Sequence, residues 1–351
     1  MGEHVLVGFS GGVDSAMTAL LLRERGCVVH AAMMSVRGPS GQGCGHDGDV
    51  RAAENLARHI GVPLDVFDLS DAYRRLVLDV FREEYLAGRT PNPCILCNPG
   101  VKFGLLPEHA RAAGIAFDRI ATGHYARIEY REALGRHVLL RGLDAGKDQS
   151  YFLYRLDAGQ LARTLFPLGG FHKTEVREMA RARGLPVHDK PDSQDFYAGD
   201  YSELLGRDEA EGDIVDSRGK VMGRHRGYWR YTPGQRKGLG VAYHEPLYVI
   251  RVEPAENRVV VGTRDEQLCP GCRVGDLRFP GPAPEAGATL MGKLRSAQPL
   301  RGMTVADIDG DGMTVRFAEP IHGVAPGQSL VMYDGDMVVG GGVIREAVQW
   351  E

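Results

Sequence analysis

Small and polar side chains gather close to the start of the chain, in the stretch Ser10-Gly11-Gly12-Val13-Asp14-Ser15. Its two glycines let the backbone turn sharply with no Cβ in the way, so successive N–H groups can converge on one anion. Ser10 and Ser15 add hydroxyl donors, and Asp14 can hold a cation or face the positive end of a helix. These residue types at this spacing predict a phosphate-binding loop.

A second group of reactive side chains is the Cys94-x-x-Cys97 pair, in a proline-containing stretch that we expect to be a shaped loop over residues 87–100. In a chain without a secretory signal, this spacing indicates metal, cluster or sulfur chemistry more often than a disulfide. The neighbouring charges of Arg89 and Lys102 can lower a thiol pKa. We therefore interpret the pair as chemically active, and two inert, half-buried thiols remain the structural alternative.

The elements that must position these residues follow from the hydrophobic pattern. A short apolar run precedes the glycine-rich loop, and a helix closed by Gly26 follows it. Further strands and helices alternate after it, which predicts a parallel α/β sheet with ligands at the carboxyl ends of its strands. We expect strands over residues 5–9, 28–34 and 64–69, and helices over 14–25, 49–59 and 71–86.

Two other kinds of loop share part of this pattern. A Walker loop requires Gly-Lys-Ser/Thr, but no lysine follows Gly12 before the helix, which argues against transfer of a γ-phosphoryl group. Gly8-x-Ser10-x-Gly12 also fits the nucleophile elbow of serine hydrolases, although that elbow normally follows several strands. A serine hydrolase is therefore kept only as a distant alternative.

The whole loop from Ser10 to Ser15 resembles the signature of the N-type ATP pyrophosphatases, the PP-loop or adenine nucleotide alpha-hydrolase-like proteins. Later motifs, in order along essentially the whole chain, resemble the tRNA-specific 2-thiouridylases, the MnmA or TrmU family. These motifs are Thr90-Pro91-Asn92-Pro93 with Cys97-Asn98, Ala121-Thr122-Gly123-His124-Tyr125, Lys147-Asp148-Gln149-Ser150, Lys173-x-Glu175-Val176-Arg177, Tyr231-Thr232-Pro233-Gly234 and Pro326-Gly327-Gln328.

The resemblance implies ATP-dependent 2-thiolation of the wobble uridine of tRNA. ATP would adenylate the uracil C2 oxygen with release of pyrophosphate, AMP would leave when sulfur attacks, and Mg²⁺ would offset the phosphate charge. Cys97 is the expected nucleophile, and Cys94 and Asp14 are the other expected catalytic residues. The implied ATP contacts are Gly8, Phe9, Ser10, Gly11, Gly12, Val13, Asp14, Ser15, Met34 and Gly123. The implied contacts to the target base and tRNA are Asn92, Pro93, Cys94, Lys147, Asp148, Gln149, Arg295 and Ser296.

One position departs from the family. Where a second cysteine is usual, after Asp192-Ser193-Gln194, this chain has Tyr197, and a phenol cannot carry a persulfide. One hypothesis makes Cys94 and Cys97 the persulfide carrier and the resolving thiol. The other places a [4Fe-4S] cluster on Cys44, Cys94 and Cys97, with one iron open to sulfide. Both need a sulfur-donor protein or another persulfide or sulfide source.

From about residue 205 onward the pattern changes to short, glycine-rich strands. We predict a PP-loop ATP-binding and thiolation domain over 1–205, a central β-rich tRNA-contacting domain over 206–264 and a C-terminal β-barrel over 265–351. Residues 217–240 carry seven Lys or Arg and no Asp or Glu, interleaved with Tyr228, Trp229 and Tyr231. This composition suits RNA phosphates and unstacked bases, although aromatics packed in a small core are the alternative. A second pair, Cys269-x-x-Cys272, is expected in a turn.

The composition narrows the class of protein. A formal net charge of −4 argues against a general DNA binder, and 43% hydrophobic residues are typical of a globular chain. The N-terminus lacks the pattern of a signal peptide and no apolar run is long enough to span a membrane, so we expect a cytoplasmic protein. The remaining alternatives are a paralogue that thiolates another RNA or a small molecule, and a non-catalytic tRNA-binding relative.

Overall fold

The computed structural model describes residues 2–36, 47–189 and 204–348. The chain folds into two compact units. Unit 1 comprises Met1–Leu78, Pro93–Gly199 and Asp336–Val338, and unit 2 comprises Asp79–Asn92, Asp200–Gly335 and Val339–Glu351. Outside the described residues lie the candidate cluster ligand Cys44, the segment Asp192-Ser193-Gln194 and Tyr197.

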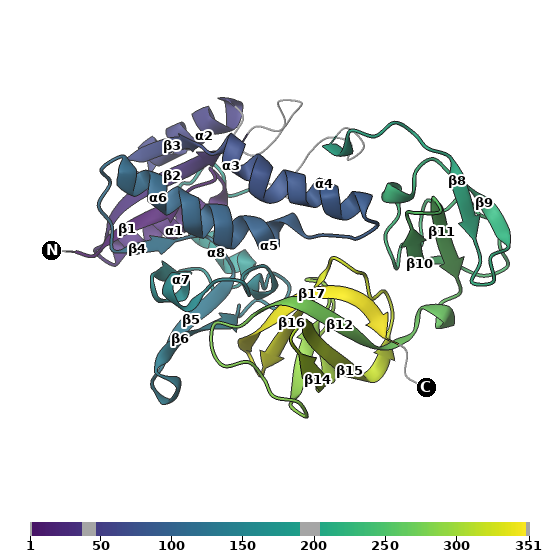
Figure 1. The fold of residues 1–351 in the computed structure, drawn as a ribbon. Coiled ribbons are helices and arrows are strands. Elements are labelled where there is room, and N and C mark those ends of the chain that lie inside the picture. Colours follow the sequence, from purple (N-terminus) through teal and green to yellow (C-terminus); the bar gives the residue numbers. More distant parts are fainter. Residues whose placement is uncertain (1, 37–46, 190–203, 349–351) are drawn as a thin grey trace. The chain divides into compact units, whose positions relative to one another are not determined.

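The described part of unit 1 contains a five-stranded parallel sheet in the order β3-β2-β1-β4-β7 (Figure 1). Its strands are β1 (His4–Gly8), β2 (Val28–Ser35), β3 (Leu64–Asp68), β4 (Arg119–Ala121) and β7 (Thr164–Leu165). The chain runs from β1 outward to β3 and then returns to the other side of β1 with β4. A topological switch point therefore lies between β1 and β4, where ligands of open α/β sheets bind.

The helices of unit 1 match the expected alternation, and the predicted strands and helices before residue 70 are confirmed to within two residues. Gly26 ends the first helix with φ +85°, as expected for a helix terminator. The described helices are α1 (Val13–Glu24), α2 (Asp47–His59), α3 (Ser70–Tyr73), the π-helical η1 (Arg74–Leu78) and η2 (Asn98–Leu105), α5 (Pro93–Cys97), α6 (Leu106–Ala112), α7 (Ala158–Ala162), α8 (Lys173–Ala182), and the 3₁₀ turns η3 (Glu132–Leu134) and η4 (Ser150–Phe152).

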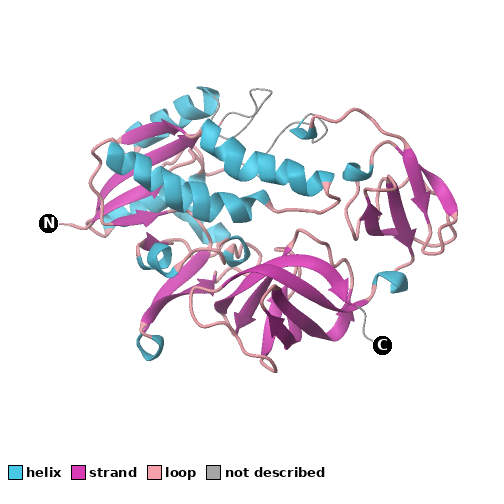
Figure 2. Cartoon of the chain, in the orientation of Figure 1, coloured by secondary structure: helices cyan, strands magenta, loops and turns pink. Residues whose placement is uncertain are grey.

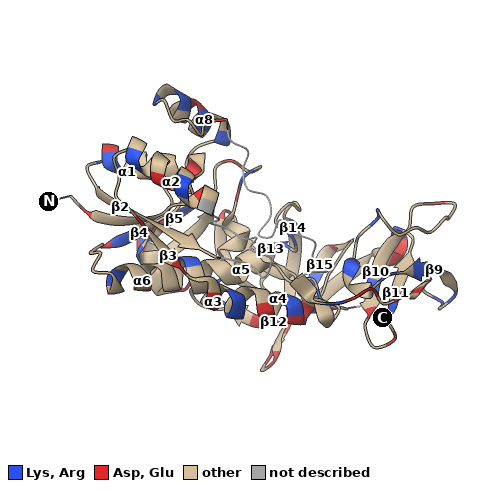
Figure 3. Cartoon of the chain, turned by 90° about the horizontal axis from the view of Figure 1, so that it is seen from above, with Lys and Arg blue, Asp and Glu red and all other residues tan. Residues whose placement is uncertain are grey.

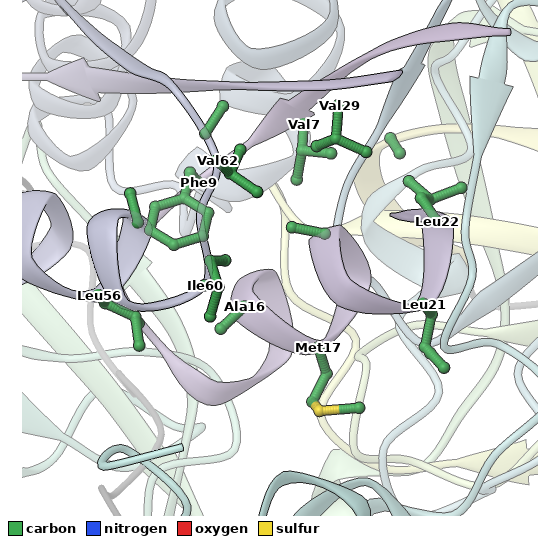
Figure 4. Close-up of a cluster of buried hydrophobic side chains, with 14 of the residues drawn as sticks. Val7, Phe9, Ala16, Met17, Leu21, Leu22, Val29, Leu56, Ile60 and Val62 are labelled. Carbon is green, nitrogen blue, oxygen red and sulfur yellow. The ribbon is translucent and has the colours of Figure 1, made fainter. Parts of the chain in front are cut away.

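The core of unit 1 forms around α1. Met17 and Leu21 of this helix belong to the same buried cluster as Val7 and Val29 of the sheet, and α2 adds Leu56 (Figure 4). Residues of α8 complete the cluster, so α1 is covered on more than one side and is apolar around much of its circumference. Each large aliphatic side chain buried in this way stabilises the fold by about 1.5–3 kcal/mol relative to an exposed one. This packing fixes the first turn of α1, which carries the loop motif.

The stretch predicted as a shaped loop, residues 87–100, is helical in its second half, so that part of the prediction is wrong. Pro93 begins α5, where its missing N–H is not needed. Pro99 lies in the first turn of η2, which continues α5 directly, so it does not interrupt the helix. Prolines at these two positions are compatible with a helix, and Cys94 and Cys97 therefore lie on one.

Unit 1 also contains an antiparallel hairpin. β5 (Ala126–Arg131) pairs with β6 (Arg136–Arg141) along their whole length. Met337, at the start of β17, pairs with Leu140 of β6. Arg127 donates to the carboxylate of Asp336 at 3.0 Å and to the Arg141 carbonyl at 2.8 Å, which holds the base of the hairpin.

The central part of unit 2 is a small sheet in the order β10-β11-β8-β9. Within this sheet, β10 and β11 are antiparallel and form a hairpin. The elements here are α4 (Asp79–Leu86), β8 (Gly212–Val215), β9 (Val221–His225), η5 (Tyr228–Arg230), β10 (Tyr248–Glu253), β11 (Arg258–Gly262) and η6 (Asp265–Gln267).

The aromatic residues of the basic stretch pack in or against a small core. Trp229 is 6% exposed, and Tyr228 and Tyr231 pack against the buried cluster of the central sheet. The basic side chains are partly neutralised, since the Arg224 guanidinium lies 3.2 Å from the Asp213 carboxylate. Along the chain as a whole, blue and red segments alternate in Figure 3. The alternative of a small core therefore holds for Trp229, and an RNA contact of the half-buried Tyr228 and Tyr231 stays a prediction.

The rest of unit 2 is a six-stranded β-barrel, in the order β12-β15-β14-β13-β16-β17, closed by pairing of β12 with β17 (Figure 2). The predicted C-terminal β-barrel is confirmed for the described residues. The strands are β12 (Cys269–Arg278), β13 (Thr289–Lys293), β14 (Arg301–Asp309), β15 (Gly312–Ile321), β16 (Ser329–Asp334) and β17 (Met337–Val348).

Cys269 and Cys272 lie in strand β12 and not in a turn, so that prediction is wrong. Both side chains belong to the buried cluster of the barrel, with exposures of 3% and 0%. The pairing register between β12 and β15 shifts between Cys269 and Gly271, and this irregularity interrupts the strict alternation of a strand. The two thiols can therefore join the same apolar cluster although they are three residues apart.

Candidate functional site

The glycine-rich loop leaves the carboxyl end of β1 at the switch point of the parallel sheet. In the strand register, Gly8 pairs with Ala32 of β2 and Val7 pairs with Ala121 of β4. Met34 near the end of β2 and Gly123 just after β4 therefore belong to the same edge of the sheet. The structure thus brings together the three segments expected to contact ATP.

Two glycines in this region are required by geometry. Gly11 has φ +73°, a left-handed conformation that disfavours any residue with a Cβ. At Gly123, a Cβ would lie 2.8 Å from the Cβ of Asp14 and 2.9 Å from its carbonyl carbon. The chain after β4 can therefore approach the first turn of α1 only because residue 123 is glycine.

The two serines of the loop have different roles. The buried Ser15 hydroxyl donates to the Gly12 carbonyl at 3.0 Å and accepts from the Ser10 N–H at 3.2 Å and the Ser10 hydroxyl at 3.3 Å. Ser10 itself is exposed. Ser15 is thus used to shape the loop, while the Ser10 side chain faces solvent and can reorient toward a ligand.

The beginning of α1 offers donors to an anion. Gly12 is the N-cap residue in an extended conformation, and no side chain caps the helix. The first N–H groups of a helix have no partner within it, and together with the helix dipole they favour negative charge. A phosphate placed against Gly11, Gly12 and Val13 would therefore meet several backbone donors at once.

Asp14 lies in this first turn and has partners that the sequence did not predict. The Lys173 ammonium donates to both carboxylate oxygens, at 2.8 and 2.7 Å, and the Tyr125 hydroxyl donates to one of them at 2.9 Å. Lys173 is 7% exposed. Its motif was noticed in the sequence, but Asp14 and Lys173 are 159 positions apart, and only the fold reveals that they pair.

His124 follows Gly123 and is neutral near pH 7. Burial lowers the pKa of His124 well below its ordinary value, and the nearby Lys102 ammonium lowers this pKa further. Its Nδ1 lies 2.7 Å from the Thr122 hydroxyl, and its ring contacts those of Phe103 and Phe166. At this edge of the sheet the imidazole is therefore a polar but uncharged group.

The first cysteine pair lies on the short helix α5. Cys94 is exposed and Cys97 is 8% exposed. Residues three apart on a helix lie on the same side, with Cβ atoms about 5–6 Å apart, so Cys94 and Cys97 share one side of α5. The helix is anchored just beyond Cys97, because the buried Asn98 amide donates to the Phe152 carbonyl at 3.0 Å. The short helix therefore presents one accessible and one shielded thiol on the same side, and sulfur transfer between them stays a prediction.

The described residues contain no group of three or more His, Cys, Asp and Glu side chains placed to hold a metal ion. The two hypotheses for Cys94 and Cys97 differ in whether a third cysteine joins them. The proposed third ligand, Cys44, lies outside the described residues. The relay and the cluster thus both remain hypotheses.

The segment expected to contact tRNA is a tightly bonded turn. The buried Asp148 carboxylate accepts from the N–H groups of Gly142 and Ser150, both at 3.1 Å. The Gln149 side chain accepts from the Tyr125 N–H at 2.9 Å. Asp148 and Gln149 therefore use their side chains to shape the turn, and the exposed Lys147 carries its positive charge toward solvent. A tRNA contact by these residues stays a prediction.

Three models of tRNA methyl transferase domains match consecutive parts of the chain. They are described as the HUP domain over residues 3–197, the PRC-barrel domain over 204–263 and, over 270–344, an aminomethyltransferase β-barrel domain. The tRNA-specific 2-thiouridylase MnmA of Geotalea uraniireducens is 43% identical over 99% of this chain and 96% of the relative. The MnmA of Endomicrobium trichonymphae is 40% identical over 97% of this chain and 98% of the relative. The chain belongs to the MnmA family.

Three of the residues that this MnmA-family chain is expected to use on the target base and tRNA belong to unit 2. Asn92 and Ser296 are half-buried. Arg295 donates to the Pro233 carbonyl at 2.6 Å and to the Gly323 carbonyl at 3.4 Å. Within unit 2, Arg295 therefore ties the end of the barrel strand β13 to the segment before β10, and its contact with tRNA stays a prediction.

None of the described helices of this MnmA-family chain combines the length and apolar character required to cross a membrane.

Proposed function

We propose that this protein is an ATP-dependent tRNA 2-thiouridylase that converts the wobble uridine of tRNA to 2-thiouridine. ATP adenylates the C2 oxygen of the uracil and releases pyrophosphate, and sulfur then attacks C2 and displaces AMP. The observation that carries this proposal is the phosphate loop at the switch point of a chain from the MnmA family. Because tRNA is the substrate, we place the protein in the cytoplasm.

The loop and the ends of the neighbouring strands supply the ATP site. The pyrophosphate part of ATP lies against the N–H groups of Gly11, Gly12 and Val13, where the helix end favours negative charge. Met34 and Gly123 flank the nucleoside from the neighbouring strands. Mg²⁺ would accompany the triphosphate as part of the substrate and would offset the phosphate charge.

Adenylation is needed because the C2 oxygen of uracil is a poor leaving group. In the relay hypothesis, a persulfide on Cys94 supplies its terminal sulfur to C2, and AMP departs with the oxygen. Cys97 then attacks the sulfur of Cys94, which releases 2-thiouridine and leaves a Cys94–Cys97 disulfide that an external thiol reduces. The shared face of α5 supports this route, because it places the two cysteines on the same side of one helix.

In the cluster hypothesis, Cys94 and Cys97 are two of the three ligands of a [4Fe-4S] cluster and Cys44 is the third. Their arrangement on one face of α5 fits two such ligands. The test is to purify the protein under nitrogen and measure iron and activity together. Full activity in a preparation without iron contradicts the cluster, and activity that follows the iron content contradicts the relay.

The function is tested by expressing the chain in a bacterial host that lacks its own thiouridylase. Mass spectrometry of the tRNA nucleosides should show that 2-thiouridine returns at the wobble position. The matched control is Cys272→Ala in the barrel, which should restore the nucleoside as the wild type does. If 2-thiouridine stays absent although the protein folds and binds ATP, the proposal is contradicted.

ATP turnover separates this proposal from its alternatives. A thiouridylase should form AMP and pyrophosphate faster when tRNA is added, whereas a non-catalytic tRNA-binding relative should form none. A paralogue that thiolates a small molecule should turn over ATP with no response to RNA. A sulfur-donor protein or a small persulfide source completes the reaction and is varied in the same assay.

A further inference from the structure

Asp14 presents an electrostatic problem at the ATP site. Its carboxylate lies in the first turn of α1, directly after the loop that is proposed to hold a triphosphate. Two negative groups within a few ångströms repel each other strongly where water is partly excluded. A bare carboxylate at this position would therefore weaken ATP binding.

The structure neutralises this carboxylate with two groups. The Lys173 ammonium binds both oxygens of Asp14, at 2.8 and 2.7 Å, and the Tyr125 hydroxyl donates to one of them at 2.9 Å. The Lys173 ammonium also lies 5.7 Å from the centre of the Tyr125 ring. The three side chains form a compact group with no net charge, which we call the Asp14 clasp.

The side chains of the clasp come from three separate segments of the chain. Backbone hydrogen bonds of Lys173 and Tyr125 hold each of these partners of Asp14. The N–H of Lys173, at the start of α8, donates to Asp144 at 3.0 Å. The N–H of Tyr125 donates to the Gln149 side chain at 2.9 Å, and the Tyr125 carbonyl accepts from the Gln149 N–H at 2.9 Å. Both partners are thus held in place by hydrogen bonds that do not depend on Asp14.

A purely structural role explains the clasp poorly. Glu24 and Arg183 already join the same two helices, α1 and α8, by a 2.7 Å ion pair at a partly exposed position. The side chain of Lys173 is 8% exposed, so burying its charge carries a desolvation penalty that the pairing only offsets. An ion pair with a buried lysine directly at the phosphate loop, where a simple apolar contact would serve packing, indicates a role in the chemistry of the loop.

We propose that Lys173, assisted by Tyr125, is a positioning residue that neutralises Asp14 and so allows the phosphate loop to accept the triphosphate of ATP. The inference rests on the proposed function. Lys173 acts through Asp14 and does not itself bind the phosphates. Replacing Lys173 should therefore no longer weaken ATP binding once the Asp14 carboxylate has been removed.

The test measures binding of α,β-methylene-ATP with Mg²⁺ by calorimetry, because this analogue cannot be cleaved between the α and β phosphates. Lys173→Met should weaken binding at least ~10-fold, as expected for an uncompensated charge close to phosphate. The double variant Asp14→Asn with Lys173→Met should bind within ~3-fold of the wild type, since no charge is left to neutralise. The matched control is Arg183→Met, which breaks the other ion pair between α1 and α8 and should leave binding unchanged.

The opposite pattern overturns the inference. If the double variant binds as weakly as Lys173→Met, Lys173 contacts the phosphates directly. If Lys173→Met does not fold, the affinity of Asp14→Asn is compared with that of the double variant. A clear loss of affinity when Lys173 is replaced in the Asp14→Asn background also contradicts the inference. Tyr125→Phe keeps the ring and removes only the donor, so a smaller, measurable loss is expected from it.

The outcomes also separate this inference from the proposed function. A folded wild type that binds no nucleotide contradicts an ATP-dependent function and the inference with it. A wild type that binds the analogue and a Lys173→Met variant that binds it equally well contradict the inference alone.

Discussion

The two Cys-x-x-Cys pairs of this protein have the same spacing and opposite surroundings. Cys94 and Cys97 lie on the helix α5, one exposed and one mostly buried. Cys269 and Cys272 lie in strand β12, inside the apolar cluster of the barrel. Burial raises the pKa of both barrel thiols, which keeps them protonated and inert near neutral pH. The spacing alone therefore does not determine reactivity.

The backbone explains the difference. A helix turns through one full turn in 3.6 residues, so cysteines three apart share a face and one of them can reach solvent beside the other. In β12, the strand is paired on both sides by β15 and β17, and the cysteines become part of the barrel interior. The pair in β12 therefore serves packing, and we propose that the pair on α5 carries the sulfur chemistry.

Serine substitutions in each pair test this difference in role with the largest expected effect. Cys97→Ser should remove 2-thiouridine formation, by several orders of magnitude, because a hydroxyl cannot replace a nucleophilic thiol. Cys272→Ser should leave the nucleoside level within ~2-fold at 25 °C, because it lies outside the proposed chemistry. Mass spectrometry of tRNA nucleosides in the complemented host measures both. Equal losses in the two variants would contradict the division of roles.

Cys94, the exposed member of the pair on α5, provides the second test of this comparison. Cys94→Ser should abolish multiple turnover if Cys94 carries or resolves the persulfide. The measurement is the amount of 2-thiouridine formed per enzyme molecule with a persulfide donor in vitro. Full activity of Cys94→Ser rules out the relay, and Cys269→Ser serves as the matched control from the inert pair.

Thiol alkylation distinguishes the pairs without substitution. Iodoacetamide should modify Cys94 at least ~100-fold faster than Cys272 in the folded protein, because only an accessible thiolate reacts. The raised pKa of Cys269 and Cys272 keeps these thiols neutral as the pH increases from 7 to 9, so their modification should remain slow over that range. Peptide mass spectrometry after timed quenching gives the rates. Rapid modification of Cys272 before unfolding would show that the barrel opens readily.

The smallest effect concerns the stability of the barrel. Cys272→Ser places a hydroxyl in an apolar cluster and should lower the free energy of unfolding by about 1–3 kcal/mol. Cys272→Ala keeps the site apolar and should cost less than the serine variant. Urea unfolding followed by tryptophan fluorescence measures both. A serine variant as stable as the wild type would mean that the hydroxyl finds a partner in the barrel.

Much of the fold could be predicted from the sequence because local signals were strong. The apolar run before Ser10 and the terminator Gly26 predicted β1 and α1, and the change to short, glycine-rich strands predicted the barrel. The phosphate loop was recognisable because all of its groups lie within a few consecutive residues. Hydrogen bonds between neighbours, such as those of Ser15, depend on little else.

The sequence by itself thus determined the residue pattern of the loop and most of the strands and helices, whereas the tertiary structure decided which charged groups pair and which thiols are buried. Lys173 reaches Asp14 only because α8 packs on α1, and no local pattern encodes a pairing across 159 positions. The two cysteine pairs look alike in sequence because spacing is a one-dimensional property. Their exposure depends on the backbone that carries them and on the elements packed against it, which only the folded chain supplies.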